Sequence, residues 1–328
     1  MLNDFVLALH ANLLSPSVLF FALGLIAALV KSDLRLPDAL YVTLTLYLLV
    51  ALGFKGGVAV HNAGVAQVLV PALAAMMLGA LIPLWCYPLL RYAGGLRPVD
   101  AAAVAAHYGS VSAVTFITAT NYLKGIHVPY ENHATAFLAI MESPAIVVGV
   151  VLGRMASGRE GLPLSKALGD VLREAVLGKS VFLLVGALVV GALCGNSGME
   201  KVEPFFVTPF QGALALFLLE MGIVTGQKLG DLRKVGPFLA AFGILMPLLH
   251  GFLGACVGKW VGLSLGGTTL MAVLASSASY IAAPAAMRLS LPEANPALYL
   301  TPSLAITFPF NITVGIPIYL AMARHLHA

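Results

Sequence analysis

Long hydrophobic runs separated by short polar stretches dominate this chain. Two of these runs, 132–153 and 204–227, contain a single carboxylate each, Glu142 and Glu220. Eight others contain no Asp, Glu, Lys or Arg: residues 5–30, 39–54, 56–90, 101–123, 180–199, 235–258, 260–287 and 294–323. Most are as long as the roughly 20 residues that a helix needs to cross a bilayer. The pattern predicts ten membrane-spanning helices.

Composition agrees with this pattern. Of the 328 residues, 60% are hydrophobic and only 10% are charged, and the mean hydropathy is +0.96. These values indicate an all-α polytopic membrane protein. No basic residue precedes Lys31, and the first apolar run is a full-length span, so we expect no cleavable signal peptide.

The placement of lysine and arginine predicts the orientation. If the N-terminus is outside, thirteen basic residues lie on the inner side and five on the outer side, in agreement with the positive-inside rule. The inner set is Lys31, Arg35, Arg91, Arg97, Arg154, Arg159, Lys166, Arg173, Lys179, Lys228, Arg233, Lys234 and Arg288. The outer set is Lys55, Lys124, Lys201, Lys259 and Arg324. Both termini are then outside, and the net charge of +4 reflects topology rather than nucleic-acid binding.

The chain also reads as two related halves. Motifs recur at offsets between about 163 and 169: Ser17-Val18-Leu19 and Ser180-Val181-Phe182, Leu36-Pro37 and Glu203-Pro204, Gly53/Gly57 and Gly222/Gly226, Ser110/Ser112 and Ser277/Ser279, Ser143-Pro144 and Phe308-Pro309. We therefore expect a five-helix repeat over 1–156, a cytoplasmic linker over 157–179 and a second repeat over 180–328. Because five is odd, the second repeat enters the membrane upside down, as in alternating-access carriers.

Three segments are rich in residues that interrupt helices. The glycines of 53–57 predict the end of the second helix. Gly109, Ser110 and Ser112 interrupt the fourth span about midway, and Ser276, Ser277 and Ser279 precede Pro284 in the ninth. Freed backbone groups persist in hydrocarbon only where they line a cavity or meet an ion, so the two broken helices are expected to cross near the bilayer centre.

Such a crossing predicts a site for a small anion. The N-terminus of a half-helix offers unpaired N–H groups and a partial positive charge. The candidate residues, with small or hydroxyl side chains, are Gly109, Ser110, Ser112, Ser277, Ser279 and Tyr280. The alternative is that these residues simply allow close helix packing.

Glu142 is the best candidate for binding a cation, because carboxylates are costly inside a membrane and usually functional. Asn311, Thr118, Thr307 and Ser303 could add hard oxygen ligands suited to sodium. A proton relay through Glu142 is the rival interpretation. Glu220 lies near a helix end, where it can reach water.

No metal, cofactor or enzyme motif stands out. Cys86, Cys194 and Cys256 occur singly, and His107 and His250 have no partner at metal-ligand spacing. The sequence contains no G-x-S-x-G, H-E-x-x-H or phosphate-binding glycine loop. We expect no transition metal, no cofactor and no enzymatic activity.

The runs SASYIAAPAAMRLSLPEANPALYL and TFPFNITVGIPIYL, with GSVSAVTF in the first half, resemble the sodium-dependent bicarbonate transporter family known from cyanobacteria and other bacteria. The resemblance covers essentially the whole chain. It implies a ten-helix, 5+5 inverted-repeat fold with core and gate domains, similar to bile-acid and sodium/proton carriers. It also implies a homotrimer in the bacterial inner membrane, surrounded by lipid.

The resemblance further implies sodium-coupled import of bicarbonate by an elevator-like movement of the core. It places the anion site on the six residues given above and sodium sites near Glu142, Asn311 and Phe308. Cyanobacterial members have Asp in an F-M-D-I-P setting where this chain has Glu142, which keeps the charge on a longer arm. They also have a longer cytoplasmic linker and bind a PII-like regulator, and the short segment 155–179 here argues against that regulation.

Other functions fit the same residues. A carrier of this fold could move another small anion, or exchange sodium for protons through Glu142. A membrane sensor or channel-like protein, in which the breaks are only packing features, is a further alternative.

Overall fold

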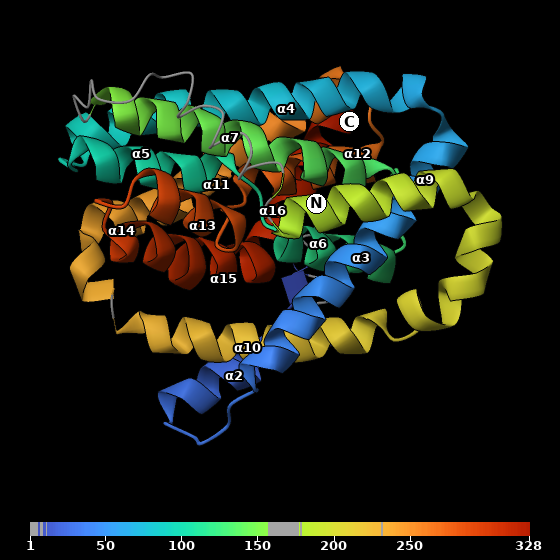
Figure 1. Ribbon diagram of the computed structural model, residues 1–328, viewed down its shortest axis with the longest axis horizontal. Coiled ribbons are helices and arrows are strands. Elements are labelled where there is room, and N and C mark those ends of the chain that lie inside the picture. The colour runs from blue at the N-terminus through green and yellow to red at the C-terminus, as the bar shows by residue number, and fades with distance from the viewer. Residues whose placement is uncertain (1–5, 7–8, 11, 157–176, 178, 231) are drawn as a thin grey trace.

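The computed structural model describes residues 6, 9–10, 12–156, 177, 179–230 and 232–328. Within these residues the fold contains helices and loops without β-strands (Figure 1). Most of the predicted linker at 157–179, including Arg159, Lys166 and Arg173, lies outside the described residues. Eight helical segments are long and apolar enough to span a membrane. This part of the chain is therefore a multi-pass helical membrane protein.

The helices follow one another closely along the chain. The first half contains α2 (Pro16–Leu29), α3 (Asp38–Ala63), α4 (Val65–Pro88), α5 (Pro98–Gly109), α6 (Ala113–Gly125) and α7 (Ala134–Ala156). The second contains α9 (Lys179–Phe206), α10 (Phe210–Leu229), α11 (Leu232–Trp260), α12 (Leu265–Ser276), α13 (Ala282–Ser290), α14 (Pro296–Thr301), α15 (Phe308–Phe310) and α16 (Ile316–His327). Short π-helical segments, Leu89–Ala93, Pro302–Thr307 and Asn311–Gly315, extend α4 and connect α14 to α16.

Two of the ten predicted spans are not among the eight. One is α2, which has only 14 residues. The other is the pair α12 and α13, which have 12 and 9 residues and are separated by the predicted break.

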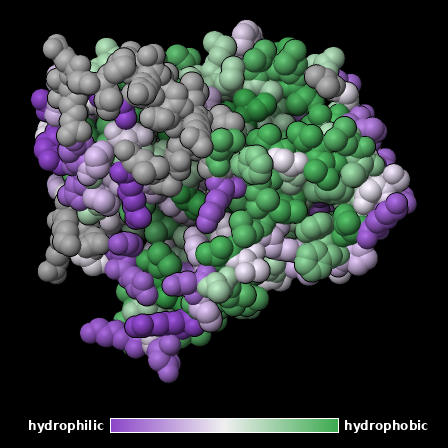
Figure 2. All heavy atoms as spheres, in the orientation of Figure 1, coloured by the Kyte–Doolittle hydropathy of each residue, from purple (hydrophilic) through white to green (hydrophobic). Residues whose placement is uncertain are grey.

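The surface has the character of a membrane protein. Figure 2 shows hydrophobic side chains over much of one face, with hydrophilic ones gathered toward its edges. Large apolar side chains on α2, α4 and α9 are exposed, among them Leu23, Met77 and Phe182. Exposed side chains of this kind are expected to contact lipid.

Glycines pair the helices α3 with α9 and α2 with α10. A Cβ at Gly57 would lie 1.9 Å from the carbonyl oxygen of Leu188, and one at Gly222 would lie 2.1 Å from that of Phe21. Only glycine allows these backbones to approach so closely. The predicted helix end at Gly53–Gly57 is therefore wrong, because α3 continues to Ala63.

The broken segments lie inside the molecule, among the other helices. Across Pro98–Gly125, which spans α5 and α6, 94% of the most hydrophobic window is buried. Helix α5 packs against α4 and α7, and α12 packs against α11 and α16. The breaks are thus surrounded by protein, where freed backbone groups can find partners.

Two polar contacts tie the starts of the broken spans to the loops before α14 and α7. The Asp100 carboxylate accepts two hydrogen bonds from Arg97, at 2.6 and 3.0 Å, and one from the Asn295 N–H at 2.8 Å. The Glu131 carboxylate accepts from the N–H and the hydroxyl of Ser264 at 2.7 and 2.9 Å. Each contact joins the start of one broken span to the loop before the last span of the other half.

Candidate functional site

Both predicted helix breaks are present. Helix α5 ends at Gly109 and α6 begins at Ala113, and the backbone of Ser110 and Ser112 is extended between them. Helix α12 ends at Ser276 and α13 begins at Ala282, with Ser277 extended. Serine favours such positions because its hydroxyl competes with the helix for backbone hydrogen bonds.

The two breaks also touch each other, as the sequence predicts. The Ser112 N–H donates to the Ser277 hydroxyl at 2.9 Å, and the Ser279 N–H donates to the His107 carbonyl at 2.9 Å. The Ser112 hydroxyl donates to the hydroxyl of Tyr280 at 3.2 Å. These contacts join residues that are about half the chain apart, so the crossing is a direct contact between the two broken spans.

Both half-helices that follow the breaks begin at this contact. Ser112 caps α6, because its hydroxyl accepts from the Thr115 N–H at 3.2 Å and from the Thr115 hydroxyl at 3.0 Å. The Ser279 hydroxyl accepts from the Ala283 N–H at 3.2 Å in the first turn of α13. Other N–H groups of these first turns have no intrahelical acceptor, so both starts carry partial positive charge.

Glu142 lies beside the first break, on α7. The backbone carbonyl of Glu142 accepts a hydrogen bond from the Ser110 hydroxyl at 3.0 Å, and its side chain is buried. The side chain borders a cavity of about 20 Å³. The lining residues come from both breaks and two further helices: Leu49, Val111, Ser112, Ala113, Glu142, Ser279, Tyr280 and Ile281. In this conformation the cavity has room for about one water molecule.

The six predicted anion-site residues divide into two groups. Ser112, Ser279 and Tyr280 line the cavity. The others support it from behind: Ser110 holds the backbone of Glu142, and Ser277 holds that of Ser112.

Gly109 belongs to the supporting group. A Cβ at this position would lie 2.6 Å from Pro83 on α4 and 2.9 Å from the Cβ of Ala145 on α7. Gly109 therefore allows α4 and α7 to pack closely against the end of α5.

Asn311 and Phe308 lie behind the second break. The Asn311 amide donates to the Ser276 carbonyl at 3.0 Å, and its oxygen accepts from the Tyr319 hydroxyl at 2.7 Å. The ring of Phe308 meets that of Tyr280 edge-on at 5.2 Å. Asn311 thus holds the end of α12, while Phe308 holds a cavity side chain in place.

The remaining predicted sodium ligands do not line this cavity. The Thr307 hydroxyl donates to the Gly243 carbonyl at 2.7 Å, and the Ser303 hydroxyl to the Tyr299 carbonyl at 2.7 Å. Thr118 donates to the Val114 carbonyl at 2.9 Å and borders a separate cavity of about 340 Å³. The structure therefore gathers Glu142, but not these three hydroxyls, around the crossing.

The sequence did not single out Leu49, Tyr319 or the His107 carbonyl as parts of this region. Leu49 lies within an apolar run of α3 and resembles many other leucines. Tyr319 lies two helical turns after Asn311, which is a spacing that places both on one helix face and could have indicated their contact.

His107 and His250, which were weighed as metal ligands, contact neighbouring side chains and backbone instead. The Nδ1 of His107 hydrogen-bonds the Ala103 carbonyl at 2.7 Å, and its ring stacks on Tyr299. The Nε2 of His250 accepts from the indole of Trp85 at 3.0 Å and lies 3.6 Å from the Cys86 sulfur. Both side chains contribute to packing between helices.

The fold and the crossing define a multi-pass helical membrane protein whose two broken helices, with α3 and α7, enclose a small cavity that contains Glu142 and two serines. The chain belongs to the Na⁺-dependent bicarbonate transporter superfamily, because the model of that family matches residues 16–324. Membership indicates a membrane transporter rather than an enzyme. A search of curated proteins finds no match.

Proposed function

We propose that this protein is a sodium-coupled symporter that imports bicarbonate by an elevator-like, alternating-access mechanism. The observation that carries the proposal is the cavity at the crossing, which is lined by Glu142 together with Ser112 and Ser279 at the starts of two half-helices. The carboxylate suits a sodium ion, and the half-helix starts suit a small anion.

Electrostatics gives a reason for coupling. An anion at the half-helix starts would be repelled by the Glu142 carboxylate in the same cavity. Opposite charges about 4 Å apart attract by about 4 kcal/mol at an effective dielectric constant of 20. A sodium ion between the carboxylate and the bicarbonate therefore turns repulsion into attraction, and each ion strengthens the binding of the other.

Further sodium contacts are proposed from the same region. Asn311 and Phe308 lie behind Tyr280 and Ser276, where a small shift of the second break would bring the Asn311 oxygen closer to the ion. Thr118, Thr307 and Ser303 are tied to other carbonyls and would have to rotate in order to take part.

The small volume of the crossing cavity supports the proposed elevator movement, because the cavity must open before bicarbonate can bind. A space of about 20 Å³ is too small for bicarbonate, which has four heavy atoms. One wall of the cavity is Leu49 of α3, which packs with α9, whereas Ser112 and Ser279 belong to the broken spans. Sliding of the broken spans past α3 would open the cavity, as elevator movement requires.

We also propose the ten-helix inverted repeat, with both termini outside the bacterial inner membrane and a homotrimeric assembly. The element order supports the repeat, since α2 to α7 and α9 to α16 each contain a glycine-paired helix, a broken span and a final span with an internal proline. The contacts of Asp100 and Glu131 support it as well. Asp100, at the start of the first broken span, contacts the loop before α14 in the second half, and Glu131, in the loop before α7 of the first half, contacts the start of the second broken span.

Proteoliposomes containing the purified protein test the function. We expect uptake of labelled bicarbonate that needs an inward sodium gradient and that carries sodium with it. Proton-coupled sodium flux without bicarbonate would instead support the exchanger, and sodium-driven uptake of another anion alone would support a carrier with a different substrate.

A further inference from the structure

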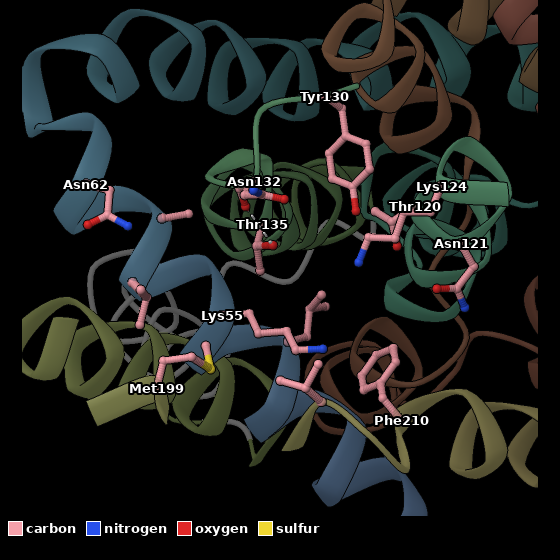
Figure 3. A pocket seen from close by; sticks show the side chains of 14 residues that line it. Lys55, Asn62, Thr120, Asn121, Lys124, Tyr130, Asn132, Thr135, Met199 and Phe210 are labelled. Atoms are coloured by element: carbon pink, nitrogen blue, oxygen red, sulfur yellow. Dashed lines mark hydrogen bonds between the residues drawn. The ribbon is translucent and has the colours of Figure 1, made fainter. Parts of the chain in front are cut away.

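Another cavity, whose lining includes two lysines and several uncharged polar side chains, lies at the end of the molecule that carries the α6–α7 loop. Its volume is about 280 Å³, enough for a small anion with several waters, since a water takes about 30 Å³. Figure 3 shows the side chains that line it, which come from α3, α6, α7, α9, α10 and the α6–α7 loop. We call this space the vestibule.

Two lysines enter the vestibule from opposite sides. Lys55 comes from α3 and Lys124 from the end of α6, and Figure 3 shows both side chains extending into the space between these helices. They are close enough to repel each other electrostatically. Lys55 is partly neutralised by Glu203 and rests over the ring of Phe210 at 4.5 Å. The vestibule therefore keeps a net positive charge.

Uncharged donors surround the lysines. Burial raises the pKa of Tyr130 to about 12, so its hydroxyl keeps its proton at neutral pH; it is hydrogen-bonded to Thr120 and would have to turn from that partner in order to donate to an anion. Figure 3 shows this hydroxyl pointing toward the vestibule. The Asn121 oxygen accepts from Gln211 at 2.7 Å, and the buried Asn121 Nδ2 has no partner among the described residues. Cations with neutral donors form an environment that favours anions.

Residues of the same three helices, α3, α6 and α7, line both the vestibule and the crossing cavity. On α3, Leu52 lines the vestibule and Leu49 the crossing cavity, about 4.5 Å apart along the axis. On α7, Thr135 lines the vestibule and Glu142 the crossing cavity, about 10 Å apart. Leu49 and Leu52 are both buried, so one turn of α3 separates the two spaces with apolar side chains.

We propose that the vestibule is an anion-capturing site, in which Lys55 and Lys124 concentrate small inorganic anions such as bicarbonate before they reach the crossing cavity. The inference rests on the proposed function for its role in transport. Capture by charge is non-selective, so chloride binds there as well, and selectivity resides at the crossing. The buried pair Leu49 and Leu52 then forms the barrier that the anion passes when the broken spans move.

Cysteine chemistry tests the vestibule without relying on transport. Ala59 lines the vestibule, and Ala59→Cys in a Cys194→Ser, Cys256→Ser background would be treated with anionic and cationic thiosulfonates. We expect the rate of modification by the anionic reagent, relative to that by the cationic reagent, to fall about tenfold when Lys55→Gln and Lys124→Gln are added. High sodium chloride should reduce the difference. If the ratio of the anionic to the cationic modification rate is the same with and without the two lysines, the proposal is overturned.

Transport gives the second readout. Lys55→Gln and Lys124→Gln together should raise the KM for bicarbonate about tenfold, leave the maximal rate unchanged and remove most of its dependence on ionic strength. The matched control is Lys201→Gln, which removes an exposed lysine that does not line the vestibule. An unchanged KM in the double variant would contradict the vestibule and leave the symporter intact. If the native protein shows no uptake, the symporter fails while the thiosulfonate result still decides the vestibule.

Discussion

The two helix breaks have the same design but different neighbours. Each contains a pair of serines, begins a half-helix at the crossing and donates an N–H to the other broken span. Beside the first break lies the carboxylate of Glu142, which borders the cavity. Behind the second lies Asn311, whose amide is occupied by Ser276 and Tyr319. The first half therefore supplies a carboxylate. The second half supplies a hydrogen-bonded frame, by which we mean Asn311 with its partners Ser276 and Tyr319.

If the protein works as the proposed symporter, this asymmetry lets one cavity treat the two ions differently. Two symmetric carboxylates would repel an anion from both sides, whereas two neutral amides would bind sodium weakly. In the proposed mechanism, one charged and one neutral neighbour would leave the starts of α6 and α13 available to an anion and keep the cation near α7.

Glu142→Gln should have the largest effect of any single change at the crossing. It removes the charge that the cavity presents to sodium, and losing one partner of a buried charged pair costs about 2–5 kcal/mol. The sodium concentration for half-maximal uptake should rise at least about thirtyfold. Sodium titrations of bicarbonate uptake in proteoliposomes measure this.

The matched control is Glu220→Gln, a carboxylate on α10 that does not line the cavity. It should keep a normal sodium response. A normal response in Glu142→Gln, or an equal loss in both variants, would remove the cation role from Glu142.

Asn311→Ala should weaken the frame of the second break. The substitution leaves the Tyr319 hydroxyl and the Ser276 carbonyl buried without their partner, which costs about 1–3 kcal/mol. The apparent melting temperature in detergent should fall by several degrees. Tyr319→Phe removes one of the two bonds and should give a smaller decrease, whereas equal melting temperatures for all three proteins would contradict the frame.

Ser112→Ala and Ser279→Ala compare the two breaks directly. Ser112 accepts from Thr115 and donates to Tyr280, while Ser279 accepts from Ala283 in the other half. Loss of a helix cap costs about 1 kcal/mol, so Ser112→Ala should raise the KM for bicarbonate about fivefold and Ser279→Ala somewhat less. Unchanged uptake kinetics in both variants would refute the anion assignment.

Glu131→Gln should have the smallest effect. Its carboxylate accepts two hydrogen bonds from Ser264 at the start of α12 in an exposed position; a hydrogen bond contributes about 0.5–1.5 kcal/mol net, and the glutamine amide oxygen keeps part of this contact. Uptake should stay near normal, with a slight decrease in melting temperature. Asp100→Asn, at the buried contact with Asn295, should lower the melting temperature more.

The sequence predicted the helical class and the contact between the breaks because hydropathy and interrupting residues are local properties. It misjudged Gly53–Gly57, since a glycine that ends a helix looks the same as one that lets α9 approach. The sequence also grouped Thr118, Thr307 and Ser303 with Glu142, but their hydroxyls face other carbonyls. Depth in the membrane follows from position along the chain, whereas the direction of a side chain depends on its helix rotation.

The vestibule was hidden for a similar reason. Lys55 and Lys124 are far apart in the sequence, where they are recognisable only as charges on the outer side. Their shared cavity exists because α3 continues past its glycines and brings Lys55 opposite the end of α6.

The most direct test of the central claim is the affinity for bicarbonate measured by titration calorimetry at increasing sodium concentration. Ions that share the cavity beside Glu142 must strengthen each other reciprocally. We expect sodium to tighten bicarbonate binding at least about tenfold in the native protein and to have no such effect in Glu142→Gln. Bicarbonate affinity that does not depend on sodium in the native protein would contradict the claim.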